Sequence, residues 1–239
     1  ANSSNSDDGN SFSSGDSLKF TGTGELDNGM IVTTYQEIDG GNLDDRYMSV
    51  EMDGLGKVTF NAHGGNSAMS AVDDVTPTAY GESWDLIGST KVAPAAGQAL
   101  KQGAVGGFAT NNSFFYDAPE MVDGLDVNLS YTPSGTDRPD GTVSYALAYT
   151  GVEGLTIGYG ADDNGLSGTN KIESETMYAK YSFGSFTVGF QESEAEQSGA
   201  TAGDDEFSAF GVTYQVSDDL TIGYTTSERE FGDKTQDEE

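Results

Sequence analysis

The sequence predicts an all-β fold, a transmembrane antiparallel up-and-down β-barrel with about twelve strands in this chain. The first observation is a period of two in residues 142–160, TVSYALAYTGVEGLTIGYG, where large apolar residues alternate with small polar ones. The break Gly-Val-Glu-Gly closes a hairpin, and the apolar faces end in Tyr149 and Tyr159, which suit an apolar surface that meets water. A soluble sandwich would bury this face in its own core, whereas a barrel turns it toward lipid.

The second observation concerns the connections between these strands. Short turns of about two to five residues alternate along the chain with acidic loops of about seven or more. A soluble sandwich needs no such alternation, but an outer-membrane barrel has short turns on the periplasmic side and long loops outside. Expected strand lengths of about nine to eleven residues also suit a tilted bilayer crossing. The connections therefore favour the barrel.

The first half of the chain follows this pattern as far as residue 63. Residues 1–16 are polar and contain glycine, and we expect them to form an external loop. Residues 64–107 are rich in alanine, glycine and serine and show no sustained period, which is typical of a long loop with a function of its own. Strands are expected over 17–26, 30–36, 47–52 and 57–63.

Strand patterns resume after this loop and continue to residue 228. The charged residues 229–239 are expected to form another external loop, and 1–239 a single barrel domain. The expected strands cover 111–116, 125–132, 142–150, 155–160, 174–183, 185–191, 206–215 and 219–228, with loops over 161–172 and 192–205.

Composition excludes several classes of protein. The 40 acidic and 10 basic residues give a net charge of −30, which argues against nucleic acid and against docking on an anionic membrane surface. It suits a surface bathed in cations or a pore that admits them. Cysteine is absent, which excludes disulfides and thiol catalysis. Ala1 begins a polar run without the features of a signal peptide, so either that peptide was removed or the chain begins within a longer protein.

Four segments carry a resemblance to a known family: LKFTGTGELDNGM (18–30), DRYMSVEMDGLGKVTF (45–60), NSFFYDAPEMVDGLDVNLSYTP (112–133) and FSAFGVTYQVSDDLTIGY (207–224). Together with the order of turns and the long loop after the fourth strand, they resemble the general porins of Gram-negative outer membranes, which are trimeric and sixteen-stranded. The similarity covers nearly all of the chain. It implies one strand before 1–16 and three after 229–239, so we expect an incomplete porin.

The resemblance implies a water-filled channel in the outer membrane of a Gram-negative bacterium, for passive diffusion of ions and small hydrophilic solutes. The acid excess adds a preference for cations. Expected partners are two further copies in a homotrimer, outer-membrane lipid and lipopolysaccharide, and no nucleic acid. The alternatives are a secreted or cell-surface acidic β-rich structural or adhesion protein without a pore, and a soluble carbohydrate-binding module. A barrel needs detergent, whereas these alternatives stay soluble.

The resemblance also implies that loop 64–107 folds into the lumen and narrows the pore. Acid on this loop opposite lysine on the wall would set a transverse field that orients dipolar solutes. Arg46 lies on the same face of its strand as Met48 and Val50 and is therefore expected at the rim of the pore. The alternative for residues 64–107 is a mobile external loop with solvated charges. The expected constriction residues are Asp73, Asp74, Glu82 and Asp85 on the loop and Lys19, Lys57 and Lys180 on the wall.

A trimer contact is expected on the first strand, since in this family the early strands form it. Leu18, Phe20, Gly22 and Gly24 share one face there, and small residues let backbones approach closely across a membrane interface. The alternative is that these glycines only permit barrel curvature.

No enzyme chemistry is expected. His63 is the only histidine and shares the polar face of its strand with Lys57 and Asn61, as a wetted wall residue would. No pair of carboxylates lies in an apolar setting that would raise a pKa. No cofactor is expected, apart from weak Ca²⁺ binding by acidic external loops such as Asp44-Asp45 and Asp162-Asp163.

Overall fold

The computed structural model describes residues 17–73, 75–83, 111–136, 139–168, 171–198, 205–231 and 234–238, and these form one antiparallel sheet of thirteen strands. A short 3-10 helix, η1 (Ala68–Val72), follows the fourth strand. The strands are β1 (Leu18–Glu25), β2 (Ile31–Asp39), β3 (Asn42–Met52), β4 (Gly56–His63), β5 (Ser113–Asp117), β6 (Leu125–Thr132), β7 (Thr142–Val152), β8 (Leu155–Asp163), β9 (Ile172–Phe183), β10 (Phe186–Gln197), β11 (Asp205–Ser217), β12 (Leu220–Phe231) and β13 (Lys234–Glu238).

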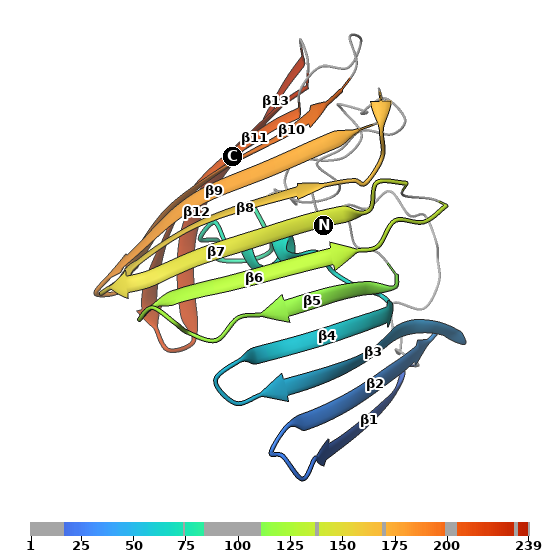
Figure 1. Ribbon diagram of the computed structural model, residues 1–239. Coiled ribbons are helices and arrows are strands. Elements are labelled where there is room, and N and C mark those ends of the chain that lie inside the picture. Colours follow the sequence, from blue (N-terminus) through green and yellow to red (C-terminus); the bar gives the residue numbers. More distant parts are fainter. Residues whose placement is uncertain are drawn as a thin grey trace, which may run out of the picture.

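Each strand pairs with its neighbours in the sequence, in the order β1 to β13, which confirms the predicted up-and-down topology. Figure 1 shows that the sheet is strongly curved, so that β12 passes behind β7 and β8. The helix η1 lies against β6, β7 and β8 on the concave side of this curve. The sheet therefore has a convex outer face and a concave inner face, which holds the described residues of the long loop after β4.

The structure differs from the sequence-based expectation at the ends of the strands. Residues 229–239 were expected to form a loop, but β12 continues to Phe231 and β13 pairs with it through Lys234. Likewise β10 runs to Gln197, through residues expected in the loop 192–205. These strand ends are charged, so they carry no alternation of apolar and polar residues, although their backbones pair as elsewhere in the sheet.

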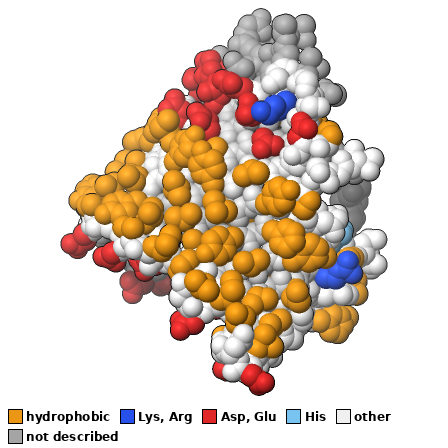
Figure 2. Space-filling view, in the orientation of Figure 1, with side chains coloured by type: hydrophobic (Ala, Val, Ile, Leu, Met, Phe, Trp, Pro, Cys, Tyr) orange, Lys and Arg blue, Asp and Glu red, His pale blue; other side chains and the backbone are white. Residues whose placement is uncertain are grey.

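The two faces of the sheet differ in polarity as the alternation predicts. In β9, Ser174, Thr176 and Tyr178 are buried on the inner face, while Met177 and Tyr181 are exposed on the outer one. Figure 2 shows hydrophobic side chains spread over the convex face, with acidic side chains near its edges. Exposed large apolar side chains run from Leu18 and Phe20 on β1 to Ile222 and Tyr224 on β12, and a contiguous apolar surface of this kind marks a membrane or interaction site. Among the described residues, no helix has the length and apolar character needed to cross a membrane.

Aromatic rings border the apolar band of the outer face at both ends of the strands. Beside the short turns, Phe186 contacts Phe183 with ring centroids 5.5 Å apart and Tyr214 with centroids 4.5 Å apart. Toward the long loops, the rings of Tyr145 and Tyr159 lie 6.0 Å apart. Two such borders are typical of the girdles that flank the lipid-facing band of an outer-membrane barrel.

Candidate functional site

The inner face carries a row of glycines that leaves room for another segment of the chain. Gly160 (β8), Gly189 (β10), Gly211 (β11) and Gly223 (β12) form this glycine track. A Cβ atom on Gly160 would lie 2.7 Å from Sδ of Met69, and one on Gly189 would lie 2.5 Å from Cδ of Pro77. A Cβ on Gly211 would overlap the carbonyl oxygen of Pro77. Residues 68–73 and 75–79 therefore pack directly on the backbone of the wall, and only glycine leaves room for this contact.

The long loop is fastened to the wall where it begins. The backbone N–H of Gly64, at a φ of 70°, donates to Oδ1 of Asn111 over 3.1 Å. Ser67 then caps η1, and the N–H of Ala68 donates to the hydroxyls of Ser130 (3.1 Å) and Ser144 (2.9 Å) on β6 and β7. These bonds satisfy an amide at the start of the helix that would otherwise be buried without a partner.

An apolar cluster forms beneath η1. Met69 and Val72 are fully buried against Ala146 and Tyr178 of the wall, and Phe115 packs at the side of the cluster. Burial of two such side chains stabilises the contact by about 1.5–3 kcal/mol each. The loop is thus held by a small core of its own inside the concave face.

Gln191 on β10 holds the next part of the segment. Its side chain is fully buried, and Nε2 donates to the carbonyl oxygens of Val72 (3.0 Å) and Asp73 (3.1 Å). Oε1 accepts from the hydroxyl of Thr76 over 3.4 Å. One amide side chain therefore satisfies backbone groups of an irregular segment that the strands themselves do not pair.

The last described part of the segment reaches β12. The hydroxyl of Thr225 donates to the carbonyl oxygen of Pro77 over 3.1 Å, and that of Ser227 donates to Ser83 over 2.9 Å. Residues 67–73 and 75–83 therefore cross the inner wall from β6 to β12. Sequence reasoning expected the loop in the lumen but did not identify Gln191 or the glycine track, since one glutamine on a polar face carries no distinctive pattern.

The three wall lysines of the expected constriction all belong to the alternate residues of their strands that face inward. Nζ of Lys19 lies 3.1 Å from Oε1 of Glu37 on β2, and the register places Lys180 opposite Thr156 and Gly189. Nζ of Lys57 lies 2.8 Å from Oδ2 of Asp117 on β5. Lys19 and Lys57 are thus each paired with a carboxylate of the neighbouring strand.

The loop carboxylates of the expected constriction are only partly described. Asp73 is half-buried under Gln191, which bonds its carbonyl oxygen, and Glu82 is half-buried farther along the segment. Asp74 and Asp85 lie outside the described residues, as do the expected external loop 1–16 and residues 84–107 of the long loop. The structure therefore brings Asp73 to the inner wall but does not bring all seven residues together.

The face expected at the trimer contact lies on the outer side of β1. Leu18 and Phe20 are each 54% exposed, and a Cβ atom on Gly24 would have no described atom within 4 Å. Gly22 shares this face, and a Cβ there would lie 3.1 Å from Oγ1 of Thr34. Arg46 is exposed on the same side of β3, opposite Gln36, as expected for a residue at the rim.

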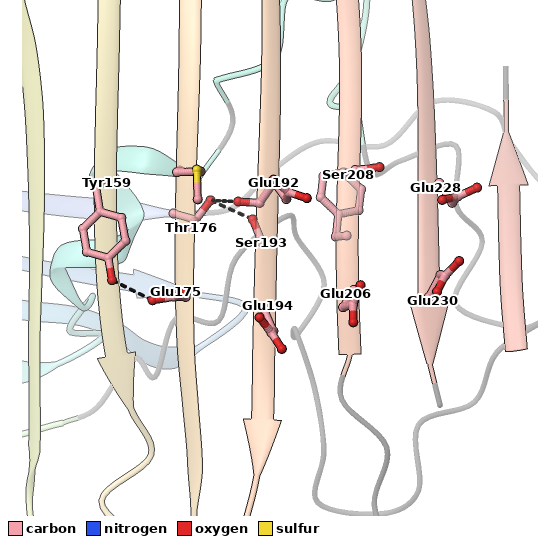
Figure 3. Close-up of a pocket in the computed structure, with 12 residues that line it drawn as sticks. Tyr159, Glu175, Thr176, Glu192, Ser193, Glu194, Glu206, Ser208, Glu228 and Glu230 are labelled. Atoms are coloured by element: carbon pink, nitrogen blue, oxygen red, sulfur yellow. Dashed lines mark hydrogen bonds between the residues drawn. The ribbon is translucent and has the colours of Figure 1, made fainter. Parts of the chain in front are cut away.

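Acidic side chains form rows on the outer face of β9–β12, beyond the apolar band. Glu194 of β10 is paired with Glu175 of β9 on one side and with Glu206 of β11 on the other. Glu206 is paired in turn with Glu230 of β12, so that four adjacent strands present glutamates in one row. Figure 3 shows this row with Glu192 and Glu228 beside it, and with the hydroxyl of Tyr159 donating to Glu175 over 2.7 Å. Adjacent like charges of this kind are costly in hydrocarbon, so the row indicates where the strands leave the membrane.

A second acidic group lies at the loop end of β2 and β3. Carboxylate oxygens of Glu37, Asp44 and Asp45 lie within 4.8 Å of one another. Exposed acidic groups of this kind are common without an ion, so weak Ca²⁺ binding stays a prediction.

Comparison with known proteins agrees with this architecture. The anion-selective porin from Comamonas acidovorans superimposes with a TM-score of 0.62 at 16% identity, over 90% of this chain and 68% of that chain. OmpT of Vibrio cholerae, folded in vitro and in its trimer form, superimposes with a TM-score of 0.60 at 13% identity, over 93% of this chain and 72% of that chain. Identities this low show the fold alone. No curated protein matches the sequence.

The sequence itself matches a family described as Gram-negative porin over residues 1–239. The match includes the sheet, the described loop segment on its inner side and the apolar outer face. It confirms the resemblance to porins that the sequence segments indicated. The chain therefore belongs to the Gram-negative porin family and is a β-barrel channel protein of the outer membrane.

Proposed function

We propose that this porin passes ions and small hydrophilic solutes by passive diffusion through a lumen narrowed by residues 64–83, with a preference for cations. The observation that carries the proposal is the crossing of the inner wall by residues 67–73 and 75–83, held by Gln191 and the glycine track. Irregular backbone at this depth is tolerated where it is bonded to protein or lines a wet cavity. Family membership and the apolar outer face argue against an adhesion protein without a pore and against a soluble carbohydrate-binding module.

Charge pairing on the inner wall supports the preference for cations. Lys19 and Lys57 are paired with Glu37 and Asp117, and Arg229 donates from Nε to Oδ1 of the buried Asp205 over 2.8 Å. Each of these bases is neutralised by a carboxylate of an adjacent strand. In a chain with 40 acidic and 10 basic residues, the unneutralised charge is then mainly negative, and it attracts cations into the lumen.

The outer face of the first strands supports assembly into a homotrimer. Phe20 and Gly22, with Met48 and Phe60 of the neighbouring strands, line a hollow of about 490 Å³ on that face. Side chains of a second copy would fill it, since packing drives association where lipid surrounds both partners. We further propose that outer-membrane lipid and lipopolysaccharide contact the rest of the apolar band.

The cation preference is tested by reversal potentials of the protein in planar bilayers under a gradient of potassium chloride. We expect the wild type to pass cations more readily, and less selectively at 1 M salt, where screening acts over about 3 Å. Glu37→Gln with Asp117→Asn leaves Lys19 and Lys57 without partners and should lower the cation-to-anion permeability ratio by roughly twofold or more. The matched variant Glu206→Gln with Glu230→Gln, on the outer face, should leave it unchanged. An anion preference of the wild type would contradict the proposal.

The fastening of the loop is tested by Gln191→Leu, which keeps the size of the side chain but removes the amide that donates to the carbonyl oxygens of Val72 and Asp73. Each buried carbonyl left unpaired costs about 1–3 kcal/mol. We expect single-channel recordings with a higher or noisier conductance, while circular dichroism shows an intact sheet. Gln215→Leu is the control, because within the described part of the chain the side chain of Gln215 bonds Ser217 and Thr221, beside a short turn and away from the long loop. Equal recordings from both variants would mean that Gln191 does not set the pore.

The trimer contact is tested by Gly22→Leu combined with Gly24→Leu. Overpacking a close contact costs about 1–3 kcal/mol per site, so we expect monomers on unheated electrophoresis and in native mass spectrometry. Val188→Leu, on the outer face of β10, should leave the trimer intact. A trimer that survives the double substitution places the contact elsewhere.

A further inference from the structure

A hollow of about 360 Å³ opens on the inner face between β3–β5 and the first residues of the long loop. The strands contribute Tyr47 and Ser49 from β3 and Thr59 from β4, all of inner parity, and the loop contributes Asn66. Its volume lies at the lower end of the range of roughly 300–1,000 Å³ typical of small-ligand sites. Because it lies between the wall and the loop, a solute that permeates the lumen would pass it.

Hydrogen-bonding groups with no partner in the described part of the chain converge on this hollow. The hydroxyls of Tyr47 and Thr59 and the amide of Asn66 make no hydrogen bond to another described residue. Among the described residues, the amide of Asn61 bonds Ser113 alone, over a long 3.5 Å. Hydroxyls and amides each offer both donors and acceptors, as do the hydroxyl groups of a sugar or polyol.

The charges that line the hollow are the ion pair of Lys57 with Asp117 and the carboxylate of Asp45, which disfavours anions and can accept a hydrogen bond from a solute hydroxyl. Lys57 and Asp117 form an ion pair of 2.8 Å, so neither is left to bind an ionic group of a solute. The carboxylate of Asp45 lies directly against Gly64, where a Cβ atom would overlap it. A charged solute would have to compete with the ion pair and lose its own hydration water. Neutral hydroxyl groups can bond the unpaired oxygens and amide of the hollow with a smaller desolvation free energy.

Two aromatic rings complete the lining in fixed positions. The ring of Tyr47 is stacked on that of Tyr35 with centroids 5.0 Å apart, and Phe115 packs against the buried cluster under η1. Fixed apolar rings offer dispersion contacts to the C–H groups of a sugar ring, while the polar groups around them bond its hydroxyls.

We propose that this hollow is a weak binding site for neutral polyhydroxylated solutes of monosaccharide to disaccharide size. The inference rests on the proposed diffusion channel and names a class of solute for it. Binding must be weak enough to allow release, so a dissociation constant on the order of 10 mM is expected. A bound ligand narrows the path of the ions that pass this recess of the wall, so its occupancy should reduce the ion current.

The test is the current through single channels in planar bilayers with increasing sucrose on one side. We expect a reduction of the current, or excess noise, that saturates with sucrose concentration. A polyethylene glycol of matched hydrodynamic radius should produce only the non-saturating effect of excluded volume. Thr59→Val combined with Asn66→Leu keeps the hollow but removes two of its three free polar groups, and should raise the half-saturating sucrose concentration by about tenfold. Tyr47→Phe is a second variant that removes one hydroxyl and no volume.

The control is Thr187→Val, a threonine of the inner wall on β10 that does not line the hollow, and it should leave the sucrose response unchanged. No saturable response in a conducting wild type would overturn the inference and leave the channel function intact. A response that is equal in wild type and in both hollow variants would also overturn it. Saturation by the zwitterion glycylglycine but not by sucrose would refute the assigned class. Absence of any ion current would instead refute the channel itself.

Discussion

The contact of residues 68–73 and 75–83 with the inner wall is the interaction on which the functional architecture depends. Met69 and Val72 form the apolar cluster with residues of the wall, and Pro77 fits where Gly189 and Gly211 carry no side chain. A side chain at these glycines would push the segment away from the sheet. The small residues of the inner face thus have a steric function in addition to lining a wet lumen.

The inverted polarity of the sheet explains why this contact needs so many specific hydrogen bonds. The large apolar side chains face outward, so the inner wall has little hydrophobic surface with which to hold an irregular segment. Polar side chains therefore supply the attachment. Gln191, Thr225 and Ser227 donate hydrogen bonds to carbonyl oxygens of the loop. The hydroxyls of Ser130 and Ser144 accept from a backbone N–H of the loop. Each bond fixes one point of a backbone that has no strand partner.

Sequence patterns could predict the fold and the face of each side chain, because alternation is a local property. The inner parity of Lys19, Lys57 and Lys180 follows from their apolar neighbours alone. The partners of Lys19 and Lys57 could not be predicted in this way, since they depend on the register between strands. The charged ends of β10 and β12 were missed for the opposite reason, because pairing there continues without an apolar face.

The pairing of wall charges changes how selectivity arises in the lumen. Unpaired lysines facing loop carboxylates would produce a field across the opening, but a lysine 2.8 Å from a carboxylate of the same wall forms a short local dipole. The field of such a dipole falls off faster with distance than that of a single charge, and salt screens it over about 8 Å at physiological strength. In the channel that we propose, the charge that reaches the middle of the lumen is the excess of carboxylates, which would favour cations without strongly orienting a neutral solute. For a solute of that kind, we expect local hydrogen bonds and contacts with rings at the wall to decide how long it stays.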